Sequence, residues 1–299
     1  GQPIPQTLPL SIDDDLVLRT RWLNLMGPLH SLSRSAGQGE SNGTVSAPAG
    51  PSFRSVLVRP LRGVVKLGGV VDSNIGWYPF ALSSARRLLQ AWEPDIIYAS
   101  AWPVTSLFVA RKISLQAKIP WVAELRDPWA DNPYSEESRW VKSLALRQER
   151  KVLSSTLGIV TVSEPWAQEL RDRHHKPTTV ILNGYDPEDF PAVATVPFAD
   201  GVVRITYTGQ LYAGRRDPNP LFEAIARLGP LAGKVKVIFY GPNPQLPMRL
   251  AEAHGVADMV QANGPVPYRD VIQAQCESDV LLLLTWNDPR ERGFCSGKL

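Results

Sequence analysis

The chain has 299 residues, 43% of them hydrophobic and 20% charged, a globular composition that excludes disorder of the whole chain. Its 32 basic and 29 acidic residues give a net charge of +3, which is too balanced to indicate a nucleic-acid partner. No apolar run approaches the ~20 residues that span a bilayer, two cysteines give no disulfide framework, and the first residues lack the features of a signal peptide, so we expect a cytoplasmic protein.

The first 90 residues show no regular alternation of elements. Residues 31–55 are rich in Ser, Gly, Ala and Pro, which predicts a mobile loop. Arg59, Arg62 and Lys66 then recur at helical spacing beside apolar residues. This pattern fits a basic amphipathic surface that contacts an anionic membrane, or an irregular segment with solvated cations, and Pro60 weakens any helix here.

Between residues 94 and 186, short apolar segments alternate with segments of helical spacing. The apolar segments predict strands at 95–99, 121–125, 158–163 and 179–184. Helices are predicted at 104–115, at 138–153 and after Ser163, which can cap a helix that has Pro165 in its first turn. Such alternation is typical of a parallel sheet covered by helices.

A second series of the same kind follows a proline-rich stretch. Residues 187–201 contain three prolines and no helical or strand period, which predicts a linker. Strands are then predicted at 204–208, 235–241, 259–264 and 279–285. We therefore predict an α/β fold of two Rossmann-like domains, residues 1–186 and 202–299, whose parallel sheets face each other across a cleft.

The turn after the first strand of the second domain combines glycines with two arginines. The apolar run 202–207 leads into Gly209 and Gly214, and Arg215 and Arg216 follow before a helix begins. A glycine turn that joins a strand to a helix leaves unpaired N–H groups and a positive dipole end, which can hold an anion. The pattern indicates either a diphosphate site or an ordinary strand-to-helix turn with two solvated arginines.

Eight ordered segments carry a resemblance to a known family. They are PDIIYAS at 94–100, IPWVAELRDPW at 119–129, GIVTVSE at 158–164, VILNGYD at 180–186, YTG at 207–209, YGP at 240–242, NGPVP at 263–267 and SGKL at 296–299. Taken together over residues 90–299, they resemble the retaining GT-B glycosyltransferases of the bacterial group-1 class, particularly those that assemble surface polysaccharides. The resemblance implies an acceptor-side domain at 1–186 and a nucleotide-sugar domain at 202–299.

The resemblance also implies a set of donor-binding residues in the second domain. They are Gly209, Arg215, Arg216, Gly241, Gly264, Val266 and Lys298. In the family an arginine often follows the first glycine, whereas Gln210 stands here, so the diphosphate would rest on the later arginines. Gly264 and Val266 would contact the base through backbone groups, although close packing explains the glycines that end strands equally well.

The acceptor side is expected at the end of the strand 121–125, because open parallel sheets place ligand-contacting groups there. The resemblance implies a polar residue facing the acceptor, and Asp127 could position or deprotonate an acceptor hydroxyl as the catalytic residue. Arg126 would lie beside it, and Trp129 could stack on a sugar face. The alternative is that Arg126 and Asp127 form a structural ion pair that caps the next turn.

Neither a metal nor another cofactor is expected. Arginines and helix dipoles can stabilise a departing diphosphate electrostatically. The histidines and cysteines show no metal-ligand spacing; they are His30, His174, His175, His254, Cys276 and Cys295. The nucleotide-sugar is therefore expected as a substrate, with no metal beside it.

We thus expect a cytoplasmic glycosyltransferase at the inner face of a membrane, which moves a sugar from a nucleotide-sugar to a saccharide or lipid-linked acceptor in cell-surface polysaccharide synthesis. The family's pair of glutamates would follow Leu299, so the chain is expected to be a fragment truncated at both ends. Three alternatives stay open: a sugar-nucleotide epimerase of the same fold, a non-catalytic nucleotide- or sugar-binding subunit, and a periplasmic sugar-binding protein.

Overall fold

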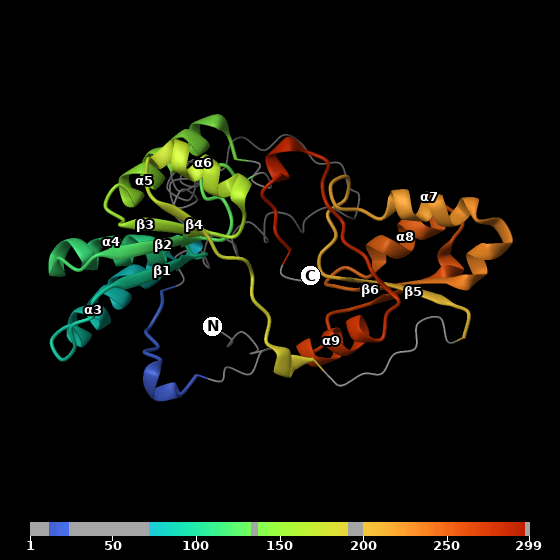
Figure 1. The fold of residues 1–299 in the computed structure, drawn as a ribbon, viewed down its shortest axis with the longest axis horizontal. Coiled ribbons are helices and arrows are strands. Elements are labelled where there is room, and N and C mark those ends of the chain that lie inside the picture. The colour runs from blue at the N-terminus through green and yellow to red at the C-terminus, as the bar shows by residue number, and fades with distance from the viewer. Residues whose placement is uncertain (1–11, 24–71, 133–136, 191–199, 297–299) are drawn as a thin grey trace, which may run out of the picture. The chain divides into compact units, whose positions relative to one another are not determined.

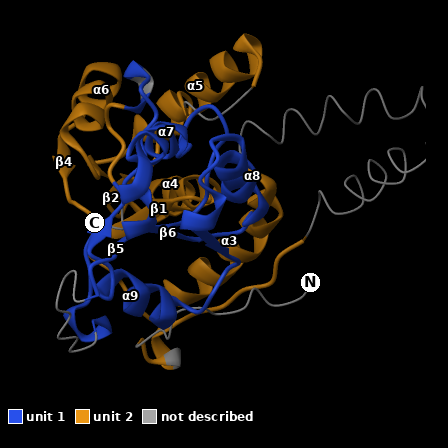
Figure 2. Ribbon diagram, turned by 90° about the vertical axis from the view of Figure 1, so that its right-hand side faces the viewer, with its two compact units in different colours: residues 1–11, 184–291, 296–299 blue, residues 12–183, 292–295 orange. Residues whose placement is uncertain are grey.

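The computed structural model describes residues 12–23, 72–132, 137–190 and 200–296. The chain divides into two compact units (Figure 2): unit 1 comprises residues 1–11, 184–291 and 296–299, and unit 2 comprises residues 12–183 and 292–295. The chain therefore leaves unit 2 after Asn183 and returns to it for residues 292–295.

Unit 2 contains a parallel sheet of four strands in the order β1-β2-β3-β4 (Figure 1). The strands are β1 (Ile97–Ala101), β2 (Trp121–Leu125), β3 (Gly158–Thr161) and β4 (Thr178–Val180). The register pairs Ile97 with Trp121, Val122 with Gly158, and Ile159 with Thr178. Each strand thus lies beside the strand that precedes it in the sequence.

The helices of unit 2 are α3 (Tyr78–Leu88), α4 (Thr105–Ala117), α5 (Arg139–Leu153) and α6 (Glu164–His174), with 3-10 turns η1 (Asp14–Leu16) and η2 (Ser73–Trp77). Right-handed connections between successive parallel strands put α4, α5 and α6 on one face of the sheet. Alternate residues of β1 and β2 point to that face, so Ala99, Trp121 and Leu125 share a core with Leu107 of α4 and Val152 of α5.

Unit 1 contains a second parallel sheet of four strands, in the order β7-β6-β5-β8. The strands are β5 (Val203–Thr208), β6 (Val235–Tyr240), β7 (Val260–Asn263) and β8 (Val280–Leu281). The helices are α7 (Asn219–Arg227), α8 (Gln245–Ala253) and α9 (Tyr268–Cys276), with 3-10 turns η3 (Pro187–Asp189), η4 (Gly229–Lys234), η5 (Ala257–Met259) and η6 (Pro289–Glu291).

The strand order of unit 1 reverses beside β5. The chain runs outward from β5 through β6 to β7 and then crosses back to β8 on the other side of β5. Consequently α7 and α8 lie over one face of this sheet and α9 lies against the other (Figure 1). The carboxyl ends of strands near such a reversal form the usual ligand crevice of open α/β sheets.

The predicted α/β fold with two parallel sheets is confirmed, and the chief difference in extent is at the last strand. Residues 279–285 were expected to form a strand, but only Val280 and Leu281 do so, and their exposed fractions are 43% and 45%. The hydrogen bond from the Leu282 amide to the Thr206 carbonyl is the last link to β5. The predicted loop at 31–55, the cations Arg59, Arg62 and Lys66, most of the predicted linker and Lys298 lie outside the described residues.

Candidate functional site

A cavity of about 330 Å³ lies at the carboxyl ends of β5 and β6 in unit 1. Residues from both strand ends, the segment after β7, and α9 enclose it; they are Thr208, Gly209, Tyr240, Gly241, Pro265, Val266, Tyr268, Val271, Ile272 and Gln275. A mostly apolar and aromatic wall with a few polar groups is typical of small-molecule sites of this size.

Two glycines bring the turns after β5 and β6 into contact at one wall of this cavity. The Gly209 amide donates to the Tyr240 carbonyl at 2.7 Å, and Gly209 has a φ of 130°, a conformation that favours glycine. A Cβ added to Gly241 would lie 2.3 Å from the Gly209 carbonyl oxygen. A side chain at residue 241 would therefore push the two turns apart.

The polar groups of the cavity come from β5 and α9. Gln275 Nε2 donates to Thr208 Oγ1 at 2.8 Å, which links the helix to the strand end. Partial burial, together with the nearby carboxylate of Asp189, raises the pKa of Tyr268, so its phenol is protonated at neutral pH. Asn263, at the end of β7, does not line this cavity, and its buried Nδ2 has no hydrogen-bond partner within the described part of the chain.

The two arginines of the glycine turn are held by different partners. The Arg216 Nε donates to Glu291 Oε1 at 2.8 Å, and its Nη2 contacts the same oxygen. The Arg216 amide also donates to the Tyr212 carbonyl at 2.9 Å, which closes the turn. Arg215 places its guanidinium 4.9 Å from the centre of the Trp286 ring. Neither arginine is among the described residues that line the 330 Å³ cavity.

The structure thus brings together three of the donor-binding residues predicted from the sequence: Gly209, Gly241 and Val266 line one cavity. Gly264 lies between the end of β7 and the lining residue Pro265. Sequence reasoning missed Tyr268 and Gln275, which lie on α9 beside the buried Ile272.

The predicted acceptor-side residues follow β2 in unit 2. Arg126 is exposed and donates through Nη2 to Asn183 Oδ1. Asp127 is exposed and lines a small cavity of about 20 Å³ with Trp129, Glu149 and others. Trp129 is only 5% exposed and packs edge-on against Phe108, with ring centroids 5.7 Å apart. Its ring therefore belongs to the hydrophobic core of unit 2.

Behind Asp127 lies a buried ionic network that the sequence analysis did not identify. Glu149 is fully buried, accepts the Ala130 amide at 2.8 Å and lies 3.2 Å from Arg173 and 2.9 Å from His174. Burial opposes ionisation of Glu149, but His174, Arg173 and the Ala130 amide outweigh it and lower the pKa of this carboxyl. The sequence signal that could have indicated this network is the position of Glu149 among the apolar residues of the buried face of α5.

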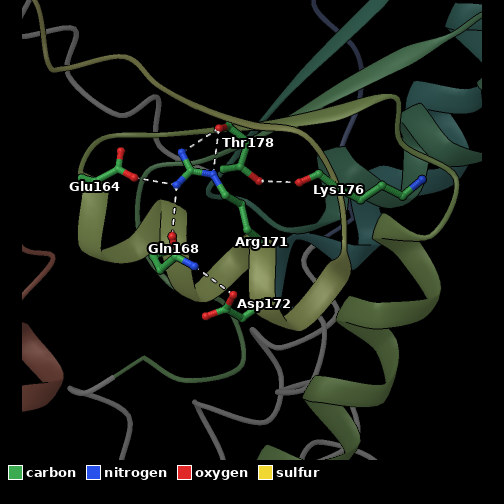
Figure 3. Close-up of polar contacts among 6 residues, drawn as sticks. All are labelled: Glu164, Gln168, Arg171, Asp172, Lys176 and Thr178. Carbon is green, nitrogen blue, oxygen red and sulfur yellow. Dashed lines mark hydrogen bonds and ion pairs between the residues drawn. The ribbon is translucent and has the colours of Figure 1, made fainter.

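Helix α6 is tied to the end of the sheet by a second, exposed set of contacts, which Figure 3 shows. Arg171 Nη1 pairs with Glu164 Oε1 at 2.5 Å, and its Nη2 donates to the Thr178 carbonyl at 3.0 Å. Gln168 joins this group through Arg171 and donates to Asp172 at 2.9 Å. Glu164, the first residue of α6, therefore has a structural role, because it pairs with Arg171 of the same helix.

The described ranges contain neither a metal-binding cluster nor a membrane-spanning helix. Across residues 12–23, 72–132, 137–190 and 200–296, no group of three or more His, Cys, Asp or Glu side chains could hold a metal ion. Within the same ranges, every helix is too short or too polar to cross a membrane.

Comparison with known proteins adds a family match for part of the chain. Residues 44–189 match the profile of Glycosyltransferase Family 4. This match supports a glycosyltransferase. A search among curated proteins found no match.

Solved structures with a similar course of the chain include glycosyltransferases and epimerases. Lipopolysaccharide outer core galactosyltransferase WaaB in its apo form is 16% identical with a TM-score of 0.47, over 70% of this chain and 55% of that chain. A putative UDP-N-acetylglucosamine 2-epimerase from Listeria monocytogenes is 13% identical with a TM-score of 0.42, over 68% and 55%. For S. aureus TarM the values are 9% and 0.46, over 70% and 39%. The chain therefore spans about half the length of the structures that it matches.

Proposed function

We propose that this chain forms part of a retaining glycosyltransferase that transfers a hexosyl or related sugar from a nucleotide-sugar to a saccharide or lipid-linked acceptor in cell-surface polysaccharide synthesis. The observation that carries the proposal is the 330 Å³ cavity at the carboxyl ends of β5 and β6. Its volume and its aromatic wall suit a nucleoside. The family match over residues 44–189 supports glycosyl transfer as the reaction.

In this proposal the base and ribose of the donor occupy the cavity between the glycine turns and α9. The diphosphate then extends along the turn that follows β5, toward Arg215 and Arg216. Cationic forks at that position stabilise the negative charge that develops on the departing diphosphate. Because Glu291 already pairs with Arg216, the diphosphate competes with a carboxylate for this guanidinium.

On the acceptor side, Asp127 is the proposed catalytic residue, because it is exposed at the end of β2 and its carboxylate can take a proton from an acceptor hydroxyl. The buried carboxylate of Glu149 fixes the loop that follows Asp127, because it accepts the Ala130 amide. Arg126 is the proposed neighbouring contact, and Trp129 contributes by packing beneath the loop. We place the protein in the cytoplasm, in peripheral contact with an anionic membrane and with no metal in its site.

The test is thermal denaturation of the full-length protein with UDP, GDP or ADP, each free and as a common sugar conjugate. A ligand that binds only the folded state stabilises it by ~2.7 kcal/mol at a hundredfold excess over its Kd. We expect a shift with one nucleotide family that is lost in Arg215→Ala/Arg216→Ala and kept in Arg249→Ala, an exposed arginine of α8. The absence of a shift with every nucleotide would contradict the proposed donor site.

A transfer assay then separates the remaining readings. Release of nucleoside diphosphate that requires an acceptor indicates glycosyl transfer. Conversion of the sugar-nucleotide without an acceptor indicates an epimerase of the same fold. Binding of the nucleotide with neither reaction in the full-length protein indicates a non-catalytic subunit.

A further inference from the structure

Helix α5 has a buried stripe and an opposite face of exposed cations. Val141, Ala145, Glu149 and Val152 are buried, at the spacing of one helix face. The exposed cations lie on the side of the helix opposite this buried stripe. They are Arg139, Arg147, Arg150 and Lys151. With 3.6 residues per turn they occupy about a third of the helix circumference.

The side chains of these four cations form no hydrogen bond or ion pair within the described part of the chain, although the carbonyls of Arg150 and Lys151 accept hydrogen bonds from Ser154. The neighbouring helix α6 differs, because its Arg171 and Arg173 pair with Glu164 and Asp131 respectively. The single acidic residue of α5 is Glu149, which is fully buried and points to the opposite side. The charged residues on the exposed face of α5 are therefore all cations.

An aromatic residue lies on the same face. Trp140 follows Arg139 and is 62% exposed. A cluster of exposed cations is attracted to an anionic leaflet, and an exposed tryptophan beside it can lie at headgroup depth. Nucleic acid is the weaker candidate, because the whole chain carries a net charge of only +3.

We propose that this face of α5, formed by Arg139, Trp140, Arg147, Arg150 and Lys151, docks on an anionic lipid bilayer. This surface would provide the membrane contact that the proposed function includes. The inference depends on that membrane contact and not on the proposed donor site. It lies in unit 2, where the proposed acceptor residue Asp127 also lies, so docking would bring a lipid-linked acceptor to the correct unit.

The experiment is cosedimentation of the full chain with vesicles of phosphatidylcholine alone or mixed with phosphatidylglycerol. The test variant is Arg147→Gln/Arg150→Gln/Lys151→Gln. The control is Arg227→Gln/Lys234→Gln/Lys236→Gln, which removes the same charge from exposed positions of unit 1. Thermal denaturation of both variants, which change only exposed side chains, checks that they are folded.

We expect the wild type to bind the anionic vesicles, and to bind them less well as salt rises. Each cation near an anionic surface contributes about fivefold to partitioning, so the test variant should lose roughly a hundredfold and the control much less. Trp140→Ala should weaken binding further without changing its salt dependence.

Equal binding of the test and control variants would overturn the role of α5 and leave membrane contact itself in place. Equal binding to vesicles without phosphatidylglycerol, or a preference for duplex DNA that the test variant loses, would overturn the lipid partner. Failure of the wild type to bind any vesicle would overturn both the surface and the membrane contact. The nucleotide-dependent thermal shift is measured without lipid, so it reports on the donor site separately.

Discussion

Arg216 and Glu291 form a buried ion pair that joins the turn after β5 to the segment before residue 292. Two guanidinium nitrogens of Arg216 contact Glu291 Oε1, and Glu291 Oε2 accepts the Trp286 amide. The exposed fractions are 9% for Arg216 and 6% for Glu291. Of the two arginines proposed to bind the diphosphate, Arg216 is therefore already paired with a carboxylate.

Replacing this carboxylate should lower stability and favour anion binding. Glu291→Gln leaves the Arg216 charge buried without its counterion, which should lower the free energy of unfolding by about 3 kcal/mol. Because the competing charge is gone, a nucleoside diphosphate should raise the melting temperature more than it does in the wild type. Urea denaturation without the nucleotide measures the first effect, and thermal denaturation with and without it measures the second; an unchanged nucleotide shift would contradict the competition.

The contact between Gly209 and Gly241 predicts a strong effect of one methyl group. In Gly241→Ala the new Cβ meets the Gly209 carbonyl oxygen at 2.3 Å, so the turns must separate, at a cost of about 2 kcal/mol. The change should also weaken nucleotide binding at the cavity. Gly264→Ala is the matched control, since no atom lies within 4 Å of its added Cβ. Equal stability of the two variants in urea would contradict the close contact.

The network of Glu149 predicts a dependence of stability on pH. Its pKa is lowered in the folded state, so its stabilising contribution is fully present above the unfolded value of about 4.3 and is lost as pH falls through the folded value. Glu149→Gln should lower the free energy of unfolding by about 3 kcal/mol at neutral pH, and the difference from the wild type should shrink in acid. Urea denaturation across this pH range measures it.

A difference that stays constant into the acid range would show that Glu149 acts through shape rather than charge. The control is Glu164→Gln, which removes an exposed carboxylate that pairs with Arg171. It should change the unfolding midpoint much less, because exposed ion pairs contribute little.

Asp127 can be tested separately from the donor site. In the full-length protein, Asp127→Asn should lower kcat by about a hundredfold or more, since a general base typically contributes at least that much. The thermal shift with the nucleotide should stay unchanged, because Asp127 and the cavity lie in different units. Asp172→Asn, which changes an exposed carboxylate of α6, should leave kcat unchanged. A normal kcat for the Asp127 variant would remove this residue from the proposed mechanism.

The features that were predicted well depend on residues that lie close together in the sequence. Alternation in segments such as 121–125 marks a strand with one buried face, because side chains point to opposite faces in turn. Gly209 and Gly241 end neighbouring parallel strands, so they meet at one edge of the sheet. The fold and one wall of the candidate site follow from such local patterns.

The features that were missed depend on residues far apart in the sequence. Nothing near Arg216 indicates that its partner is Glu291. Likewise Ser163 Oγ donates to the Gly293 carbonyl at 2.6 Å, and a Cβ on Gly293 would overlap the ring of Trp166. The return of residues 292–295 to unit 2 is set by tertiary packing, which no local period encodes.

The strand order of unit 1 has a consequence for synthesis of the chain. In unit 2 each new strand can join its predecessor as it leaves the ribosome, whereas Ile205 of β5 waits for Val280 of β8 as its outer neighbour. Until then, the nascent chain presents an open β5 edge that other chains can pair with. The two residues of β8 pair with Ile205 and Thr206, so this edge of β5 is covered only after most of unit 1 has been synthesised.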